Sequence, residues 1–124
     1  MTEVLLLNSI SDLRDDGGGR CVVSGSHGGS SAAAFVLRCA RRPALVCFND
    51  AGVGKDGAGI AALAMLQAVG VAALAYSHNS ARIGSAEDGW AHGEVSAFND
   101  WAQKRGVAVG MPVSEAVARF QAVL

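Results

Sequence analysis

The sequence predicts an α/β fold: one three-layer sandwich over residues 1–124, in which helices cover both faces of a mostly parallel sheet of about four or five strands. Two observations predict it. Short apolar runs, typical of strands buried on both faces, alternate with helical segments of about a dozen residues. The length is that of one domain, and the chain shows neither a linker nor a repeat. We expect a flavodoxin-like or short Rossmann-like order of strands.

The first expected strand differs from the others because a short connection follows it. That connection has no room for a full crossover helix, so this strand should be an edge strand or an antiparallel one. The fourth expected strand is almost free of polar residues, which indicates burial on both faces. The expected strands cover residues 3–8, 20–26, 44–50, 71–77 and 107–109.

Capping residues indicate where the first two helices begin. Ser30 or Ser31 can cap a helix that ends before Pro43. Asp56 can cap a second helix over residues 57–69, since a carboxylate accepts hydrogen bonds from the free amides of a first turn. This second helix is apolar or made of small residues nearly all round. We therefore expect it to be covered on more than one side.

The last third of the chain is expected to hold two helices around the short fifth strand. Ser85 and Asp88 have the spacing of a capping box at the start of a helix over residues 85–106. Val95, Phe98 and Trp101 then lie on its apolar stripe. The final helix, over residues 110–124, is expected to bury Val113, Ala116, Val117, Phe120 and Val123.

Composition excludes several classes of function. The formal net charge is -1 at pH 7, and the basic residues are scattered, so the chain lacks the basic face of a nucleic-acid-binding protein. No apolar run approaches the roughly 18 residues of a membrane helix, and no signal peptide is recognised, so we expect a cytoplasmic protein. Cys21, Cys39 and Cys47 form no C-x-x-C pair and are expected to be buried free thiols. Since 51% of residues are hydrophobic, we expect a homo-oligomer.

A glycine-rich stretch raises the question of nucleotide binding. Gly52, Gly54 and Gly57 match G-x-G-x-x-G between an expected strand and an expected helix. However, Asp50 places a carboxylate where a pyrophosphate would approach, and the next strand ends without an acidic residue to hold a ribose. As a P-loop, the stretch lacks Ser or Thr after Lys55. A nucleotide- or flavin-mononucleotide-binding module using residues 52–59 is therefore the alternative hypothesis.

Polar side chains follow three consecutive expected strands. If these strands are parallel, their carboxyl ends share one edge of the sheet, where α/β proteins bind ligands. Residues distant in the sequence would then converge on one site. The polar groups are Ser24, Ser26, His27, Gly28 and Gly29 after the second strand, Asn49, Asp50, Lys55 and Asp56 after the third, and Ser77, His78, Asn79, Ser80 and Arg82 after the fourth.

Four of these residues are the expected catalytic groups. His27 and His78 can act as acid and base, because an unperturbed imidazole titrates close to neutral pH. Asp50 can orient a histidine, and Ser26 can act as a nucleophile if the loop of His78 reaches it. A single metal ion on these imidazoles and Asp50 is geometrically feasible, but no paired-ligand spacing supports it, so we expect neither metal nor cofactor.

The remaining polar residues are the expected substrate-binding groups. Gly28, Gly29 and Ser30 open a helix and can present backbone amides to an anion. Lys55 and Arg82 supply positive charge, and the guanidinium of Arg82 suits bidentate contact with a carboxylate. The polar side chains expected to complete the substrate site are Asn49, Asn79 and Ser80.

These residues predict a small enzyme. It would be a hydrolase, lyase or isomerase that transfers protons on a small metabolite bearing a carboxylate or an amide. A fold of this breadth does not by itself choose a reaction. Besides the nucleotide-binding module, a non-catalytic subunit of a larger enzyme is the remaining alternative, since the apolar composition indicates a partner or a second copy.

Overall fold

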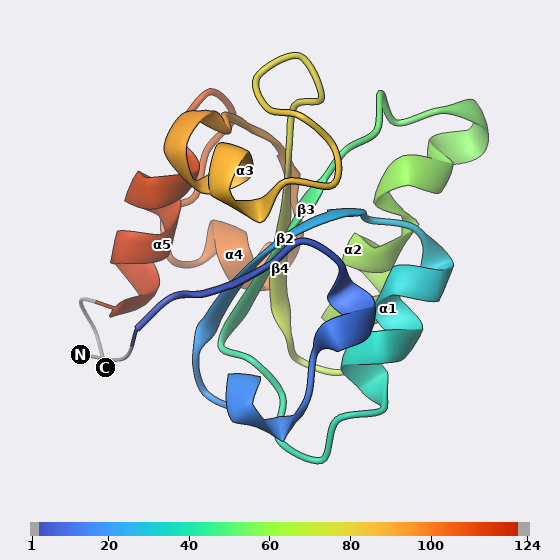
Figure 1. Cartoon of the computed structure of the whole chain (residues 1–124), viewed down its shortest axis with the longest axis vertical. Helices are drawn as coiled ribbons and strands as arrows, with labels where there is room; N and C mark the ends of the chain where they lie inside the picture. The colour runs from blue at the N-terminus through green and yellow to red at the C-terminus, as the bar shows by residue number, and fades with distance from the viewer. Residues whose placement is uncertain (1–2, 122–124) are drawn as a thin grey trace.

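The structure is a computed structural model that describes residues 3–121. It contains a five-stranded sheet in the order β1-β2-β3-β4-β5 (Figure 1). The first four strands are parallel to one another, and the fifth is antiparallel to the fourth. The predicted α/β class with a mostly parallel sheet is therefore confirmed. The strands are β1 (Leu5–Leu7), β2 (Cys21–His27), β3 (Leu45–Asn49), β4 (Ala72–Tyr76) and β5 (Val95–Phe98).

The strand order is sequential, which differs from the expected arrangements. A flavodoxin-like sheet has the order 2-1-3-4-5 and a Rossmann sheet 3-2-1-4-5-6, so both reverse direction beside their first strand. Here each step along the chain moves one strand further across the sheet. The parallel strands therefore have no switch point, although their carboxyl ends still share one edge.

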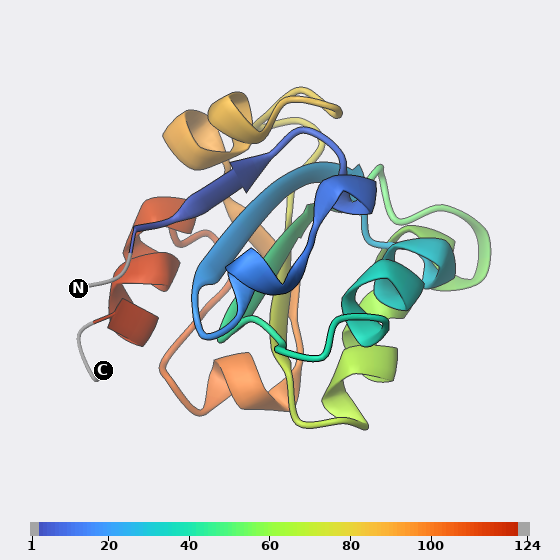
Figure 2. The same cartoon turned by 60° about the horizontal axis from the view of Figure 1, so that its bottom comes forward.

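Helices cover both faces of the sheet. Because right-handed crossovers that all step the same way place their helices on the same side, α1 and α2 share one face. α3 and α5 lie on the other face (Figure 2), and α4 packs against β4. The helices are α1 (Ser30–Leu37), α2 (Ala61–Gln67), α3 (Ala86–His92), α4 (Asp100–Gln103) and α5 (Val113–Gln121), with short 3₁₀ helices η1 (Ile10–Asp12), η2 (Asp15–Gly17) and η3 (Lys55–Ile60).

Two hydrophobic cores follow from the alternation of side chains along the strands. Val46 and Phe48 of β3 point to the core under α1 and α2, whereas Leu45 and Cys47 point to the core under α3 and α5. Every residue of β3 and β4 is buried, as expected for strands covered on both faces. All three cysteines are buried free thiols, which confirms the prediction.

The expected helix over residues 85–106 is wrong in its second half. α3 ends at His92, and Val95–Phe98 forms β5. Gly93 stops the helix with ψ 140, and its bare backbone packs against Tyr76 of β4. The spacing of Val95 and Phe98 fits a helical stripe as well as a strand, so periodicity alone misassigned them. The expected strand at residues 107–109 is likewise wrong, because β5 takes the place beside β4.

The first strand is an edge strand, as expected, and two capping expectations need correction. β1 is parallel to β2, and η1 and η2 take the place of a crossover helix in the short connection between them. Gly29 occupies the N-cap of α1, rather than Ser30 or Ser31. Asp56 caps no helix, since it lies inside η3 at φ 56 and α2 begins after Ile60. In α5, the expected Val113, Ala116, Val117 and Phe120 are buried, and Val123 lies outside the described residues.

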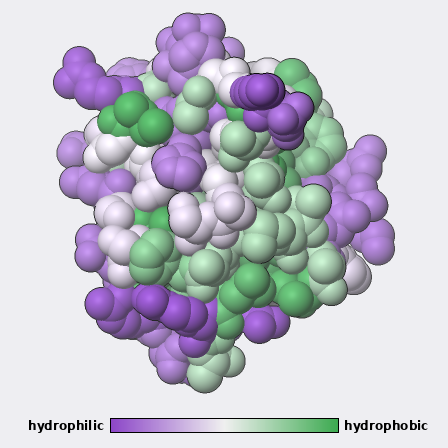
Figure 3. All heavy atoms as spheres, turned by 90° about the vertical axis from the view of Figure 1, so that its right-hand side faces the viewer, coloured by the Kyte–Doolittle hydropathy of each residue, from purple (hydrophilic) through white to green (hydrophobic). Residues whose placement is uncertain are grey.

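The outer faces of α1 and α2 are apolar. Neither helix contains a charged residue, and the space-filling view shows apolar residues spread over this side of the molecule (Figure 3). Met65 is 38% exposed and Val69 40% exposed, and Ala34, Ala64 and Ala68 are exposed beside them. The surface of a solvated helix normally carries charge, so this face is unusual. Within residues 3–121, no helix has the length and apolarity required to cross a membrane.

Candidate active site

The loop after β4 brings the carboxyl ends of the strands together. This crossing loop (residues 77–85) runs back over β3 and β2 toward β1 before α3 begins, and it appears at the top of Figure 1 in yellow. The expected convergence of loops at one edge therefore has a physical basis in hydrogen bonds. Asn49 Nδ2, at the end of β3, donates to the Ala81 carbonyl oxygen (3.1 Å). The Gly84 amide donates to the Gly25 carbonyl oxygen of β2 (2.7 Å). The Ala86 amide donates to Asn8 Oδ1, just after β1 (3.0 Å).

Asp50, directly after β3, is the buried centre of this edge. The residue is only 5% exposed. Its Oδ1 accepts hydrogen bonds from the amides of Gly52 (2.8 Å) and His78 (3.0 Å), and its Oδ2 accepts one from the Ser96 hydroxyl (2.7 Å). Burial alone would raise the pKa of Asp50, but these hydrogen bonds favour the carboxylate and lower the pKa below its ordinary value. Asp50 is therefore held as an anion.

His78 is the group that this carboxylate orients. Its Nδ1 lies 3.2 Å from Asp50 Oδ1, and an ionised carboxylate only accepts hydrogen bonds, so Nδ1 carries the proton. The neutral ring then has its lone pair on Nε2. The side chain is 49% exposed, and the imidazole lies beside Gly52. Asp50 and His78 thus form a dyad in which Nε2 is free to accept a proton.

Ser96 is a third residue at this site, and the sequence did not predict its contact with Asp50. Ala75 pairs with Ala97 and Tyr76 pairs with Val95, so Ser96 is an extra residue in β5, a β-bulge. Bulges redirect side chains, and this one turns a hydroxyl toward Asp50. Sequence reasoning placed Ser96 on a helix, where it had no reason to meet a residue 46 positions earlier. Only recognition of a strand at residues 95–98 would have revealed it.

His27, at the end of β2, has the opposite hydrogen-bonding pattern. The Gly29 amide donates to His27 Nδ1 (3.1 Å), so that nitrogen holds the lone pair. The proton of the neutral ring is consequently on Nε2, which can donate but not accept. His27 is exposed and pairs in the sheet with Asn49, the neighbour of Asp50. The two predicted catalytic histidines therefore stand at the same edge, one as an acceptor and one as a donor.

The glycine-rich stretch after β3 is largely exposed, but its backbone amides bond within the protein. In this glycine loop (residues 50–60), non-glycine residues adopt positive φ at Ala51 (51), Val53 (68) and Asp56 (56), which is costly for residues with side chains. A phosphate cradle needs amides that point to the ligand. Here the described hydrogen bonds join amides of the loop to acceptors of the protein itself, and the donors are Ala51, Gly52, Val53, Gly54, Gly57 and Gly59.

Three predicted site residues serve structural contacts. Asn49 is fully buried, and its side chain accepts from the Ala51 amide (2.8 Å) while donating to the crossing loop. It therefore joins two loops. The Ser26 hydroxyl accepts from the Ile10 amide (2.8 Å), so it contacts the segment that follows β1. Ser80 donates to the Ser77 carbonyl oxygen (2.7 Å) and accepts from the Glu94 amide.

The expected anion-binding amides are also engaged. The Gly28 amide donates to the Asn49 carbonyl oxygen, and the Gly29 amide donates to His27, so neither is free for a ligand. Ser30 is exposed in the first turn of α1. Lys55 and Asn79 are exposed on the glycine loop and the crossing loop. These last three remain at the predicted edge, with side chains open to solvent.

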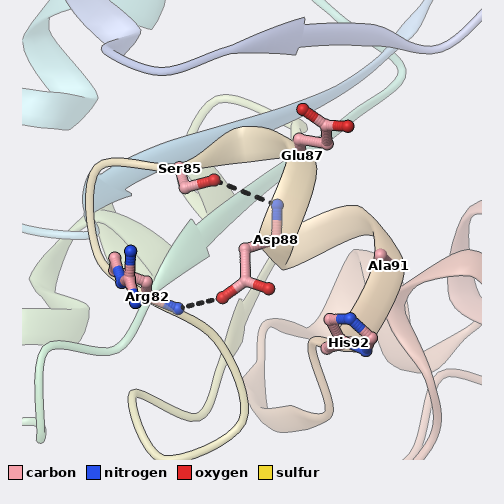
Figure 4. Close-up of a pocket in the computed structure, with 6 residues that line it drawn as sticks. All are labelled: Arg82, Ser85, Glu87, Asp88, Ala91 and His92. Atoms are coloured by element: carbon pink, nitrogen blue, oxygen red, sulfur yellow. Dashed lines mark hydrogen bonds between the residues drawn. The ribbon is translucent and has the colours of Figure 1, made fainter.

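Arg82 lies apart from the dyad, beside α3. It lines an open pocket of about 370 Å³ together with Asp88 and His92 (Figure 4). Its backbone amide donates to Asp88 Oδ2 (2.6 Å), and the Ser85 hydroxyl caps α3 by accepting from the Asp88 amide (3.1 Å), as the capping-box spacing predicts. The same pocket is lined by the carboxylates of Glu87 and Asp88.

The sequence matches no protein-family model, no curated protein and no solved structure. Within residues 3–121, His, Cys, Asp and Glu side chains nowhere gather in a group of three that could hold a metal ion. The site is therefore interpreted from its own geometry. Its central feature is a buried carboxylate that holds an exposed imidazole by Nδ1.

Proposed function

We propose that this protein is an acid–base enzyme in which His78 is the general base. The observation that carries the proposal is the 3.2 Å contact between Asp50 Oδ1 and His78 Nδ1, with the imidazole half exposed. A base must have a free lone pair where a substrate can reach it, and here that lone pair is on Nε2. Asp50 fixes the ring and stabilises the imidazolium that forms when Nε2 takes a proton.

His27 is the complementary donor in this proposal. Its Nε2–H can donate to an oxygen of the substrate on which negative charge develops while His78 removes a proton. β2 and β4 are separated by β3, so the two histidines start from strands about 10 Å apart. That spacing suits a small metabolite bridging both rings. The reaction class follows from this pairing: a hydrolase, lyase or isomerase acting beside a carboxylate or an amide.

The experiment follows proton transfer directly. Purified protein is incubated in D₂O with a panel of small carboxylates and amides, and proton NMR detects exchange at carbon, elimination or hydrolysis. We expect His78→Gln to lower the rate with a responsive compound by about 10²- to 10⁴-fold. The matched control is His92→Gln, an exposed histidine of α3 outside the dyad, which should keep the rate.

Two results would decide against the proposal. Equal rates in wild type and His78→Gln would remove His78 from the chemistry. A second screen measures the melting temperature with nucleotides and flavin mononucleotide, since a ligand that binds only the folded state raises it. A shift with nucleotides alone would favour the alternative binding module, even though the amides of the glycine loop bond within the protein.

We also propose that a second copy of this chain covers the apolar face of α1 and α2, which makes the protein a homo-oligomer. The support is the charge-free sequence of both helices and the exposure of Met65. Light scattering should give a dimeric or larger mass that Met65→Glu reduces. Val109→Glu is the control, because Val109 is 69% exposed but lies between α4 and α5. A monomeric wild type would refute self-association.

The proposed location is the cytoplasm. The three buried free thiols support it, since reducing compartments keep cysteines unpaired.

A further inference from the structure

Ser96 holds the second oxygen of the carboxylate that orients His78. Its hydroxyl lies 2.7 Å from Asp50 Oδ2 and 3.4 Å from the Ala75 carbonyl oxygen. A hydroxyl has one proton to donate, and the short contact to an ionised acceptor is the stronger one. The proton of Ser96 is therefore directed to Asp50.

The two oxygens of Asp50 have different tasks. Oδ1 accepts from the Gly52 amide, the His78 amide and the His78 ring, whereas Oδ2 has the Ser96 hydroxyl. The last torsion of an aspartate side chain is broad and roughly two-fold, so a carboxylate without a partner on Oδ2 turns more freely. Rotation would move Oδ1 away from the ring, whose hydrogen bond within residues 3–121 is this contact with the carboxylate.

The β-bulge explains how a residue of the edge strand reaches this position. In a regular antiparallel pair, residues 95 and 97 would lie opposite two residues that are also two positions apart. Here they lie opposite adjacent residues, because Val95 pairs with Tyr76 and Ala97 pairs with Ala75. Ser96 thus has no partner of its own in β4 and is free to turn to Asp50. Of the two acceptors near this hydroxyl, the Asp50 carboxylate at 2.7 Å is closer than the Ala75 carbonyl oxygen at 3.4 Å.

We infer that Ser96 is a positioning residue, which holds the Asp50 carboxylate in place. The neutral ring of His78 then carries its proton on Nδ1 and presents Nε2 to the substrate. This inference rests on the proposed function, because it assigns Ser96 a role through the same dyad. Ser96 itself is not placed in contact with substrate. Its effect on the rate would therefore arise from the orientation of His78, with an expected loss in kcat of about 10- to 100-fold in Ser96→Ala.

Nitrogen-15 NMR of the histidine rings tests the inference without a substrate. At a pH where the rings are neutral, wild-type His78 should show one tautomer, with the proton on Nδ1. We expect Ser96→Ala to show a mixture of both tautomers, and Ser96→Thr, which keeps the hydroxyl, to restore the wild-type pattern. Ser80→Ala is the matched control, because Ser80 joins the crossing loop to the Glu94 amide without touching Asp50.

The outcomes separate this inference from the proposed function. A Ser96→Ala spectrum identical to wild type, or a Ser96→Thr spectrum that stays mixed, would overturn the positioning role while leaving His78 as the base. A wild-type spectrum with the proton of His78 on Nε2 would overturn the dyad, and with it both proposals. Because the hydroxyl is retained in Ser96→Thr, loss of folding in Ser96→Ala would not remove the test.

Discussion

Asn49, the last residue of β3, and Asp50, which follows it, join the same two loops. Asn49 links the Ala51 amide of the glycine loop to Ala81 of the crossing loop. Asp50 links the Gly52 amide to His78 in the same way. The two residues differ in their other interactions. The described hydrogen bonds occupy both ends of the Asn49 amide, whereas Asp50 carries a negative charge and makes a further contact with an imidazole.

This difference separates a structural polar residue from a functional one. A carboxamide can donate to one loop and accept from the other, which is all that Asn49 does, and it is fully buried. A carboxylate can only accept, so Asp50 binds amides of both loops and still attracts the Nδ1–H of an exposed ring. Exchanging the two side chains, one at a time, tests whether these roles depend on chemistry and not on position.

The largest expected effect is that of Asn49→Asp. One carboxylate oxygen would still accept from the Ala51 amide, but the other would face the Ala81 carbonyl oxygen, where an amide now donates, which leaves a buried and poorly compensated charge. We expect a loss of about 3–5 kcal/mol in the free energy of unfolding at neutral pH, measured by urea denaturation. A loss below about 1 kcal/mol, the scale of a single neutral hydrogen bond, would show that Asn49 does not hold the crossing loop.

The sequence predicted that both residues lie at this edge and that Asp50 meets a histidine, but it did not predict the structural contacts of Asn49. Parallel strands ending in polar loops are sufficient to bring Asp50 and His78 to one edge, and the structure brings them into contact. Asn49 was expected to bind substrate because its burial depends on the path of the crossing loop. That path is set by contacts with residues as distant as Asn8, which no local pattern reveals.

The fold shows the same limit. The apolar runs at β2, β3 and β4 were recognisable because burial on both faces removes polar residues from a strand. β5 was not, since Val95 and Phe98 are spaced as on a helix and the strand carries a bulge at Ser96. The sequential order of strands was equally hidden, because the placement of α1 and α2 on one face is decided by packing and not by either helix alone.

The next effect concerns Asp50→Asn, which keeps the shape of the side chain. The amide oxygen can still accept from the Gly52 and His78 amides, so we expect a loss of only about 1–2 kcal/mol in the free energy of unfolding. The charge that holds the His78 ring is lost, and with it the proposed activity. Comparison with Asn49→Asp in the same urea series is the control. Equal losses in both variants would contradict the division between structural and functional roles.

Lowering the pH should reduce the difference in the free energy of unfolding between wild type and Asp50→Asn. The pKa of Asp50 is lowered in the folded protein, so its contribution to stability is present above the unfolded pKa of about 3.9 and is lost as pH falls through the lower folded value. Urea denaturation of both proteins from neutral pH to about pH 3 measures this difference. A difference in the free energy of unfolding that stays constant over that range would show that folding does not lower the pKa of Asp50.

The smallest expected effect is a gain in stability from Ala51→Gly. Ala51 is exposed, and its φ of 51 is costly for a residue with a side chain. Glycine removes that cost, about 1–2 kcal/mol, but adds about 0.5–1 kcal/mol of chain entropy to the unfolded state, so we expect a net gain of about 0.5 kcal/mol. Ala64→Gly, in the exposed face of α2, is the matched control and should lose about 1 kcal/mol. If both variants lose stability equally, Ala51 is not strained. A gain at Ala51 alone would mean that Asn49, by binding its amide, holds the glycine loop in a conformation its own residues disfavour.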